Sequence, residues 1–119
     1  MEPAFSLRGR SDVYVGSAAE ILSDVLPAER VVVVTDATID RLYPGLLAPY
    51  EKVLIGRGES IKTLRTVEEL YRRFIELGVD RKSFVLGVGG GIVTDVAGFA
   101  ASTYMRGIGF GFVSTTLLG

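Results

Sequence analysis

The chain has 119 residues, of which 48% are hydrophobic, so it is long enough for a single domain with a substantial core. Its 13 lysines and arginines and 14 acidic residues give a net charge of −1, and no run of like charges indicates a nucleic-acid or membrane partner. Neither cysteine nor histidine occurs, which excludes disulfide bonds and removes the usual ligands of a catalytic zinc site.

The start of the chain carries no pattern typical of export. Residues 1–12 lack the apolar core of a signal peptide. The longest apolar stretch, Leu86–Tyr104, contains Asp95 and several glycines, which argues against a membrane span. Together with the absence of cysteine, these features predict a cytoplasmic protein.

The first third of the chain predicts a hairpin, a helix and a buried strand. We expect Asp12–Val15 to be a short edge strand that pairs with Phe5–Leu7. A helical pattern begins at Ser17 and ends at Pro27. The β-branched run Arg30–Asp36 is typical of a strand that is buried on both faces, as in a parallel sheet.

Helices and strands continue to alternate after that strand. Thr38–Leu47 predicts a short helix and Lys52–Ile55 the next strand. Thr63–Leu77 is the clearest helix, because its apolar residues recur at helical spacing, and Gly78 stands where a helix C-terminal glycine belongs.

The last third predicts strand, helix and strand over Ser83–Gly89, Ile92–Met105 and Gly109–Ser114. The run of small residues in the middle of this helix predicts that it lies close to its neighbours. The whole order favours an α/β fold with a Rossmann-like parallel sheet, helices on both faces and an N-terminal β-hairpin. Ligands of such folds bind beyond the carboxyl ends of the strands.

A cluster of glycines, Gly89-Gly90-Gly91, stands where a strand gives way to a helix. A phosphate or pyrophosphate would explain it, since the helix N-terminus offers free N–H groups to an anion that can approach bare backbone. A tight turn with close helix packing would explain it equally well. The spacing fits neither G-x-G-x-x-G, because Ile92 stands at the third glycine, nor a Walker loop.

Charged residues near the strand ends each have two interpretations. Asp36 ends a strand and is either a helix N-cap, which we favour from the residue alone, or a ribose ligand. Asp95 lies in the first turn or so of a helix, where it either compensates the helix dipole or is a buried carboxylate that binds a ribose. Glu59 and Lys62 are ordinary turn charges by default, and Arg106 is either a helix C-terminal cation or a grip for an acidic ligand.

Three motifs together resemble the N-terminal domain of 3-dehydroquinate synthases: "GVGGGIVTDVAGFAASTYMRGI", then "VSTTLLG", with "GESIK" upstream. The resemblance implies an NAD-dependent lyase of the shikimate pathway that converts 3-deoxy-D-arabino-heptulosonate 7-phosphate to 3-dehydroquinate and phosphate. It also implies a divalent metal, zinc or cobalt, and a homodimer. Residues 1–119 are then the nucleotide-binding domain of a larger two-domain enzyme. The residues that bind the metal lie in the other domain and not in this chain, so the chain alone is expected to be inactive.

The resemblance also implies roles for individual residues. Gly90, Gly91 and Ile92 match the positions whose backbone meets the NAD pyrophosphate. The other matching cofactor positions are Asp36, Glu59, Lys62, Asp95, Thr115, Thr116 and Leu118. Arg106 matches an arginine associated with the substrate phosphate. Ser114 and Thr94 depart from the family, which often has proline and glycine there.

Two alternatives to a 3-dehydroquinate synthase stay open, a sister cyclase and a non-catalytic nucleotide-binding module, and a third is disfavoured. A sister sugar-phosphate cyclase of the inosose or valiolone synthase type shares most of these motifs, and its distinguishing residues lie largely in the other domain. A metal-dependent polyol dehydrogenase is disfavoured by "TYMRG" and "TTLL". A nucleotide-binding module without catalytic activity would keep the glycine turn and the ribose acids.

Overall fold

The computed structural model of the chain describes residues 5–7, 11–13, 30–56 and 63–114. The N-terminal hairpin is confirmed: β1 (Phe5–Leu7) pairs antiparallel with β2 (Ser11–Val13). The helix predicted from Ser17 to Pro27 lies outside the described residues. No helix in the described ranges has the length and apolarity to cross a membrane.

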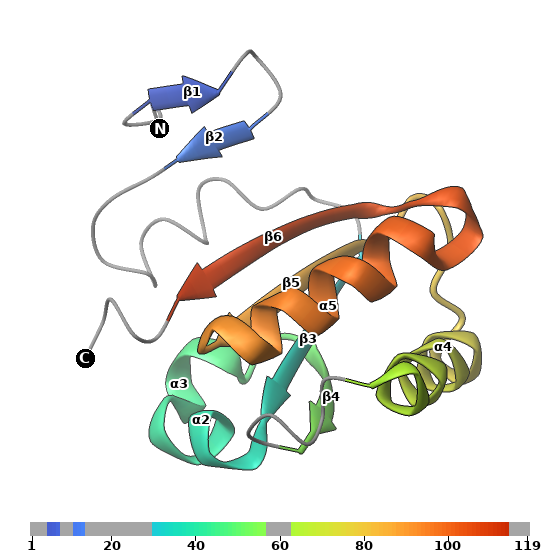
Figure 1. The fold of residues 1–119 in the computed structure, drawn as a ribbon. Helices are drawn as coiled ribbons and strands as arrows, with labels where there is room; N and C mark the ends of the chain where they lie inside the picture. The colour runs from blue at the N-terminus through green and yellow to red at the C-terminus, as the bar shows by residue number, and fades with distance from the viewer. Residues whose placement is uncertain (1–4, 8–10, 14–29, 57–62, 115–119) are drawn as a thin grey trace.

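The centre of the fold is a four-stranded parallel sheet with the order β4-β3-β5-β6 (Figure 1). Its strands are β3 (Val31–Asp36), β4 (Glu51–Ile55), β5 (Phe84–Gly89) and β6 (Gly109–Ser114). All six residues of β3 are buried, as its β-branched sequence predicts for a central strand. The predicted Rossmann-like α/β arrangement is therefore confirmed.

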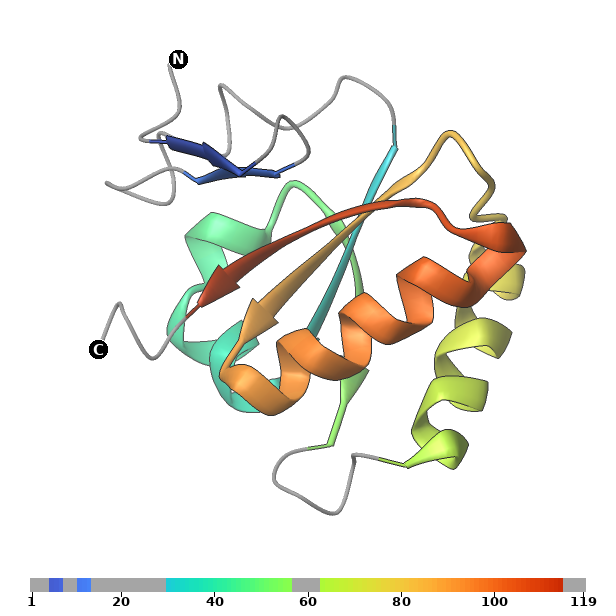
Figure 2. The same ribbon diagram turned by 45° about the horizontal axis from the view of Figure 1, so that its top comes forward.

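Helices cover both faces of this sheet (Figure 2). On one face α4 (Leu64–Leu77) and α5 (Gly91–Thr103) pack on a core that includes Val32, Val34 and Val85. On the other face, α3 (Pro44–Leu47) places Leu47 against the alternate residues of the same strands. The short α2 (Ala37–Leu42) connects β3 to α3.

Helix α4 follows its local sequence signals closely. The hydroxyl oxygen of Thr63 accepts a hydrogen bond from the backbone N–H of Thr66 and so caps the N-terminus. Gly78 ends the helix with a φ of 72°, in the left-handed region that glycine adopts without strain. Between these ends, Leu70 and Phe74 are completely buried. The prediction for this segment is confirmed.

Two helix predictions were wrong in detail. The single helix expected over Thr38–Leu47 is broken at Tyr43, because a residue before proline is driven out of the helical region and Pro44 instead begins α3. The helix expected to reach Met105 ends at Thr103 and continues as a 3-10 turn, η2 (Tyr104–Arg106). The regular helix ends because Tyr104 has an extended backbone, with φ −71° and ψ 126°, and Met105 and Arg106 after it both have positive φ.

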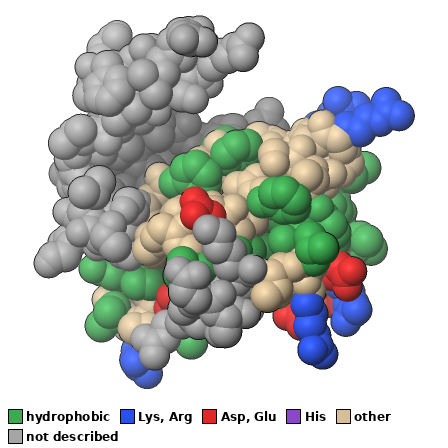
Figure 3. All heavy atoms as spheres, viewed as in Figure 1, with side chains coloured by type: hydrophobic (Ala, Val, Ile, Leu, Met, Phe, Trp, Pro, Cys, Tyr) green, Lys and Arg blue, Asp and Glu red, His purple; other side chains and the backbone are tan. Residues whose placement is uncertain are grey.

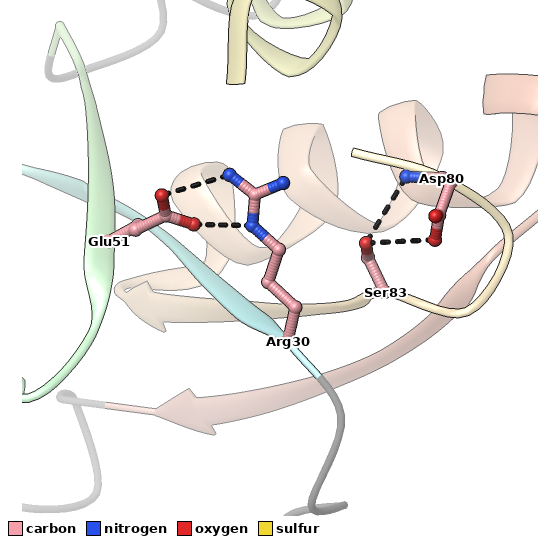
Figure 4. A network of polar contacts seen from close by, with 4 residues as sticks. All are labelled: Arg30, Glu51, Asp80 and Ser83. Atoms are coloured by element: carbon pink, nitrogen blue, oxygen red, sulfur yellow. Dashed lines mark hydrogen bonds and ion pairs between the residues drawn. The ribbon is translucent and has the colours of Figure 1, made fainter. Parts of the chain in front are cut away.

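Polar side chains link the amino-terminal ends of the strands (Figure 4). Arg30 donates two hydrogen bonds to the carboxylate of Glu51, with N–O distances of 2.6 and 2.8 Å. Beside it, Ser83 and Asp80 bond to each other in the turn that leads into β5. The hydrogen bond from Arg30 lowers the pKa of Glu51 below its ordinary value of 4.5.

The Arg30–Glu51 pair makes the stability of the fold depend on pH in the acidic range. Because the pKa of Glu51 is lower in the folded state, the pair stabilises the fold above about pH 4.5, and this contribution is lost as pH falls through the folded-state value. We expect Glu51→Gln to flatten the acid side of the stability curve, by at most about 1 kcal/mol since both side chains are partly exposed. Urea unfolding at a series of acidic pH values measures this. Arg30→Gln should flatten the same limb, and an unchanged slope in Glu51→Gln would contradict the assignment.

Candidate nucleotide-binding site

The carboxyl ends of the four parallel strands meet at one edge of the sheet. In the pairing register Asp36 of β3 lies opposite Ile55 of β4, and Gly89 of β5 lies opposite Ser114 of β6. The last paired residues of β3 and β5 are Val34 and Gly87, so two further residues along each strand bring Asp36 level with Gly89. The glycine bend and the strand-end acid are therefore neighbours, as expected.

The chain leaves this edge in opposite directions from the two central strands. After β3 it turns into α2 and α3 on one face, and after β5 it turns into α5 on the other. Adjacent strands whose helices part in this way form a topological switch point, and the crevice there is the usual ligand site of open parallel sheets. Asp36 and Gly89 end the two strands at this switch point and so define the candidate crevice.

Two of the glycines are explained by packing. A Cβ atom on Gly89 would lie 2.9 Å from the Cβ of Val93, and one on Gly87 would lie 3.0 Å from the Cβ of Ala97. Both neighbours belong to α5, so glycine at these positions allows the helix to lie directly on β5. For Gly87 and Gly89, the interpretation of close helix packing is confirmed.

Gly91 has no such explanation. A Cβ atom added there would meet nothing within 4 Å, and its φ is not in the left-handed region. Gly91 is exposed, while the flanking Gly90 and Ile92 are half-buried, so the bend is open to solvent. The backbone at Gly91 therefore borders free space that an approaching group could occupy.

The N-terminus of α5 has hydrogen-bond donors to offer at this point. Gly90 is its N-cap and has no side chain to provide a capping bond. The first N–H groups of a helix have no acceptor within the helix, and the positive end of the helix dipole lies there. Bare backbone, free space and a dipole of this sign fit a phosphate or diphosphate group.

Asp36 caps the N-terminus of α2. Its side chain is buried, and Oδ1 accepts a hydrogen bond of 2.8 Å from the backbone N–H of Ile39. The interpretation as an N-cap is confirmed. Because a carboxylate has two oxygens, the cap is compatible with a sugar hydroxyl that donates to Oδ2.

Of the two interpretations of Asp95, the buried carboxylate was wrong. Asp95 is exposed and lies one turn beyond Gly91, because the small residues Ala97, Ala100 and Ala101 occupy the face of α5 that meets the sheet. It lines a groove of about 680 Å³ that also involves α4 and β6. Exposed hydrophobic side chains gather on this face of the molecule (Figure 3) and include Leu64, Phe99, Phe110 and Phe112.

Arg106 lies at the opposite edge of the sheet from the glycine bend. It follows the far end of α5, and the chain then enters β6 at Gly109, which pairs with Phe84 at the start of β5. Thirteen helical residues separate the two ends by about 20 Å. The structure does not bring Arg106 to the crevice, and its contact with a substrate phosphate stays a prediction.

The remaining predicted site residues, Glu59, Lys62, Thr115, Thr116 and Leu118, lie outside the described residues. One residue at the crevice was missed by sequence reasoning: Thr35 donates a hydrogen bond of 2.7 Å to the carbonyl of Val88. The only signal in the sequence was a hydroxyl at the end of an otherwise apolar strand. The sequence has no histidine or cysteine, and no three carboxylates in the described ranges gather as a metal site, so the described residues do not fit a metal.

Comparison with known families decides the relationship. The profile described as 3-dehydroquinate synthase N-terminal matches residues 52–119, more than half of the chain. The chain belongs to the 3-dehydroquinate synthase family. The family resemblance of the three sequence motifs is thereby confirmed.

Individual members of this family and its structural relatives are also similar. The 3-dehydroquinate synthase of Thermococcus kodakarensis is 44% identical over 102 residues, which cover 82% of this chain and 30% of the relative. Two solved structures match over 82% of this chain with TM-scores of 0.69. One is a 2-deoxy-scyllo-inosose synthase with carbaglucose-6-phosphate, NAD+ and Co2+, at 29% identity and 30% of its length. The other is the 2-epi-5-epi-valiolone synthase of Streptomyces hygroscopicus subsp. jinggangensis 5008 with NAD+ and Zn2+, at 39% identity and 29% of its length.

The chain thus spans about 30% of the length of these relatives.

Proposed function

We propose that this chain is the NAD+-binding domain of a 3-dehydroquinate synthase. The observation that carries the proposal is Gly91: neither packing nor backbone conformation requires a glycine there, yet it opens a helix at the topological switch point, across from Asp36. Family membership and the NAD+ in both structural relatives support the same ligand.

In this proposal each side of the crevice binds one part of the dinucleotide. The backbone amides of Gly90, Gly91 and Ile92 bind the diphosphate, and the carboxylate of Asp36 accepts from the adenosine ribose. Asp95, on the same helix and at the groove, faces a second ribose. NAD+ bound there supplies the transient oxidation and re-reduction that the family resemblance implies.

The whole reaction needs more than the residues of this chain. We propose that the complete enzyme converts 3-deoxy-D-arabino-heptulosonate 7-phosphate to 3-dehydroquinate and phosphate, and that its metal is bound outside residues 1–119. The chain alone is then inactive. The cytoplasmic location, the homodimer and the substrate contact of Arg106 belong to the same proposal. A sister cyclase acting on a related sugar phosphate is the second candidate, because both solved relatives are of that type.

Calorimetric titration of the 119-residue chain with NAD+ tests the proposal directly. We expect saturable binding with one site per chain, and weaker binding of AMP, which lacks the diphosphate. Inorganic pyrophosphate should compete with NAD+, since both need the N-terminus of α5. Absence of saturable binding by a chain that is folded by circular dichroism would refute NAD+ binding by this domain.

A substitution of Asp36 can separate its role as a helix cap from its proposed role as a ribose acceptor. Asparagine caps helices about as well as aspartate, so we expect Asp36→Asn to change the free energy of unfolding by less than about 0.5 kcal/mol. The same change should raise the Kd for NAD+ by about five- to tenfold, because asparagine has one side-chain oxygen: with that oxygen in the cap, an NH2 group takes the place of Oδ2 and cannot accept from the ribose. Calorimetry and urea unfolding measure the two quantities.

Asp36→Ala is the matched comparison. It should weaken NAD+ binding in the same way and also destabilise the fold by about 1 kcal/mol through loss of the cap. If Asp36→Asn binds NAD+ as tightly as the wild type, Asp36 is a cap and has no part in binding.

A further inference from the structure

A buried hydroxyl connects the two strand ends that flank the crevice. Thr35 precedes Asp36 in β3, and its Oγ1 donates a hydrogen bond of 2.7 Å to the carbonyl oxygen of Val88, which precedes Gly89 in β5. Both Thr35 and Val88 are completely buried. This bond joins two residues that lie 53 positions apart in the sequence.

The bond lies where the regular pairing of these strands has ended. The register of β3 with β5 stops at Val34 and Gly87, whereas β5 stays paired with β6 as far as Gly89. Between the two central strands, a side chain therefore provides a link one residue beyond the last backbone pair. Such a link limits how far the strand ends can separate at the switch point.

The carbonyl that Thr35 holds belongs to the residue just before the glycine bend. A peptide unit is planar, so holding the carbonyl of Val88 also orients the N–H of Gly89. Gly89 lies tightly against Val93 in the first turn of α5. A shift of the Gly89 peptide would therefore also move the amides of Gly90 and Gly91. On the other strand, the main chain of Thr35 leads directly to Asp36.

We propose that Thr35 is a positioning residue of the dinucleotide site, which sets the separation between Asp36 and the amides of the glycine bend. This inference rests on the proposed function. Thr35 does not touch the ligand, since its side chain is completely buried. A ligand that spans the crevice depends on this separation, whereas one that contacts a single side does not.

Thr35→Val removes the hydroxyl and keeps the shape of the side chain. In calorimetry with the 119-residue chain, we expect the Kd for NAD+ to rise about tenfold, while the Kd for adenosine, which carries no phosphate and so reaches the Asp36 side alone, changes by less than about twofold. A bond that only stabilises the core would not produce this split. Equal effects on both ligands, no effect on either, or a Thr35→Val chain that does not fold would overturn the proposal.

Thr35→Ser is the matched control, because it keeps the hydroxyl and loses only a methyl group. We expect it to bind NAD+ as the wild type does, and weakening equal to that of Thr35→Val would count against a role for the hydroxyl. Amide NMR of the ligand-free chain separates this inference from the proposed function. Thr35→Val should shift the signals of Gly89–Gly91 even if the wild type fails to bind NAD+, and unshifted signals would overturn the coupling.

Discussion

Gly91→Ala is expected to weaken NAD+ binding by about ten- to a hundredfold without destabilising the fold. The added methyl group meets no protein atom within 4 Å, so it projects into the space where the diphosphate would lie. Displacing the anion costs hydrogen bonds to a charged group, each about 1.5–3 kcal/mol. In the helix, alanine is favoured over glycine, so the free energy of unfolding should stay constant or rise by up to about 1 kcal/mol. Calorimetry and urea unfolding test the two parts.

Gly89→Ala is the control with the opposite pattern. Its Cβ would overlap the Cβ of Val93 at 2.9 Å, which is close to the backbone of α5 and cannot move without the helix. We expect a loss of about 1–3 kcal/mol of stability from this overpacking. If Gly91→Ala instead destabilises the chain and leaves NAD+ binding intact, the glycine at position 91 serves the fold and the proposed diphosphate site is wrong.

Phe74→Ala is expected to have the largest effect on stability. Phe74 is completely buried in the core between α4, α5 and the sheet, and its ring meets that of Tyr104 edge-on at a centroid distance of 5.2 Å. Removing such a ring costs about 3–5 kcal/mol through lost burial and a residual cavity. Because small domains have a total stability of about 5–15 kcal/mol, much of the margin would be lost. Urea unfolding measures the change.

Ile75→Ala provides the comparison on the same helix. Ile75 is 67% exposed, so the same kind of truncation should change stability by less than about 0.5 kcal/mol. Similar losses of stability at both positions would show that the buried face of α4 has been assigned wrongly.

The architecture was largely predictable because its signals are local. The β-branched run of β3 and the spacing of apolar residues in α4 depend on neighbours a few positions away, and so do Thr63 and Gly78 as helix ends. Pro44 carried an equally local signal, and the predicted helix should have been divided there.

The candidate site was predictable only in outline. Placing Asp36 and the glycines at one edge required no more than the rule that parallel strands end together. Whether a given side chain of α5 meets the sheet or the solvent depends on how the helix is rotated against strands far away in the sequence. For this reason the sequence left open whether Asp95 is buried or exposed, and Thr35 was not recognised.

The sequence by itself determined the strands, the helices and the presence of a glycine bend at a strand end, because periodicity, capping and turn chemistry act over a few residues. Only the tertiary structure divided the glycines into Gly89, which lies against Val93, and Gly91, which borders open space. It also placed Arg106 at the far edge of the sheet. These differences arise from contacts between segments distant in the chain, and no local pattern records which atoms will meet there.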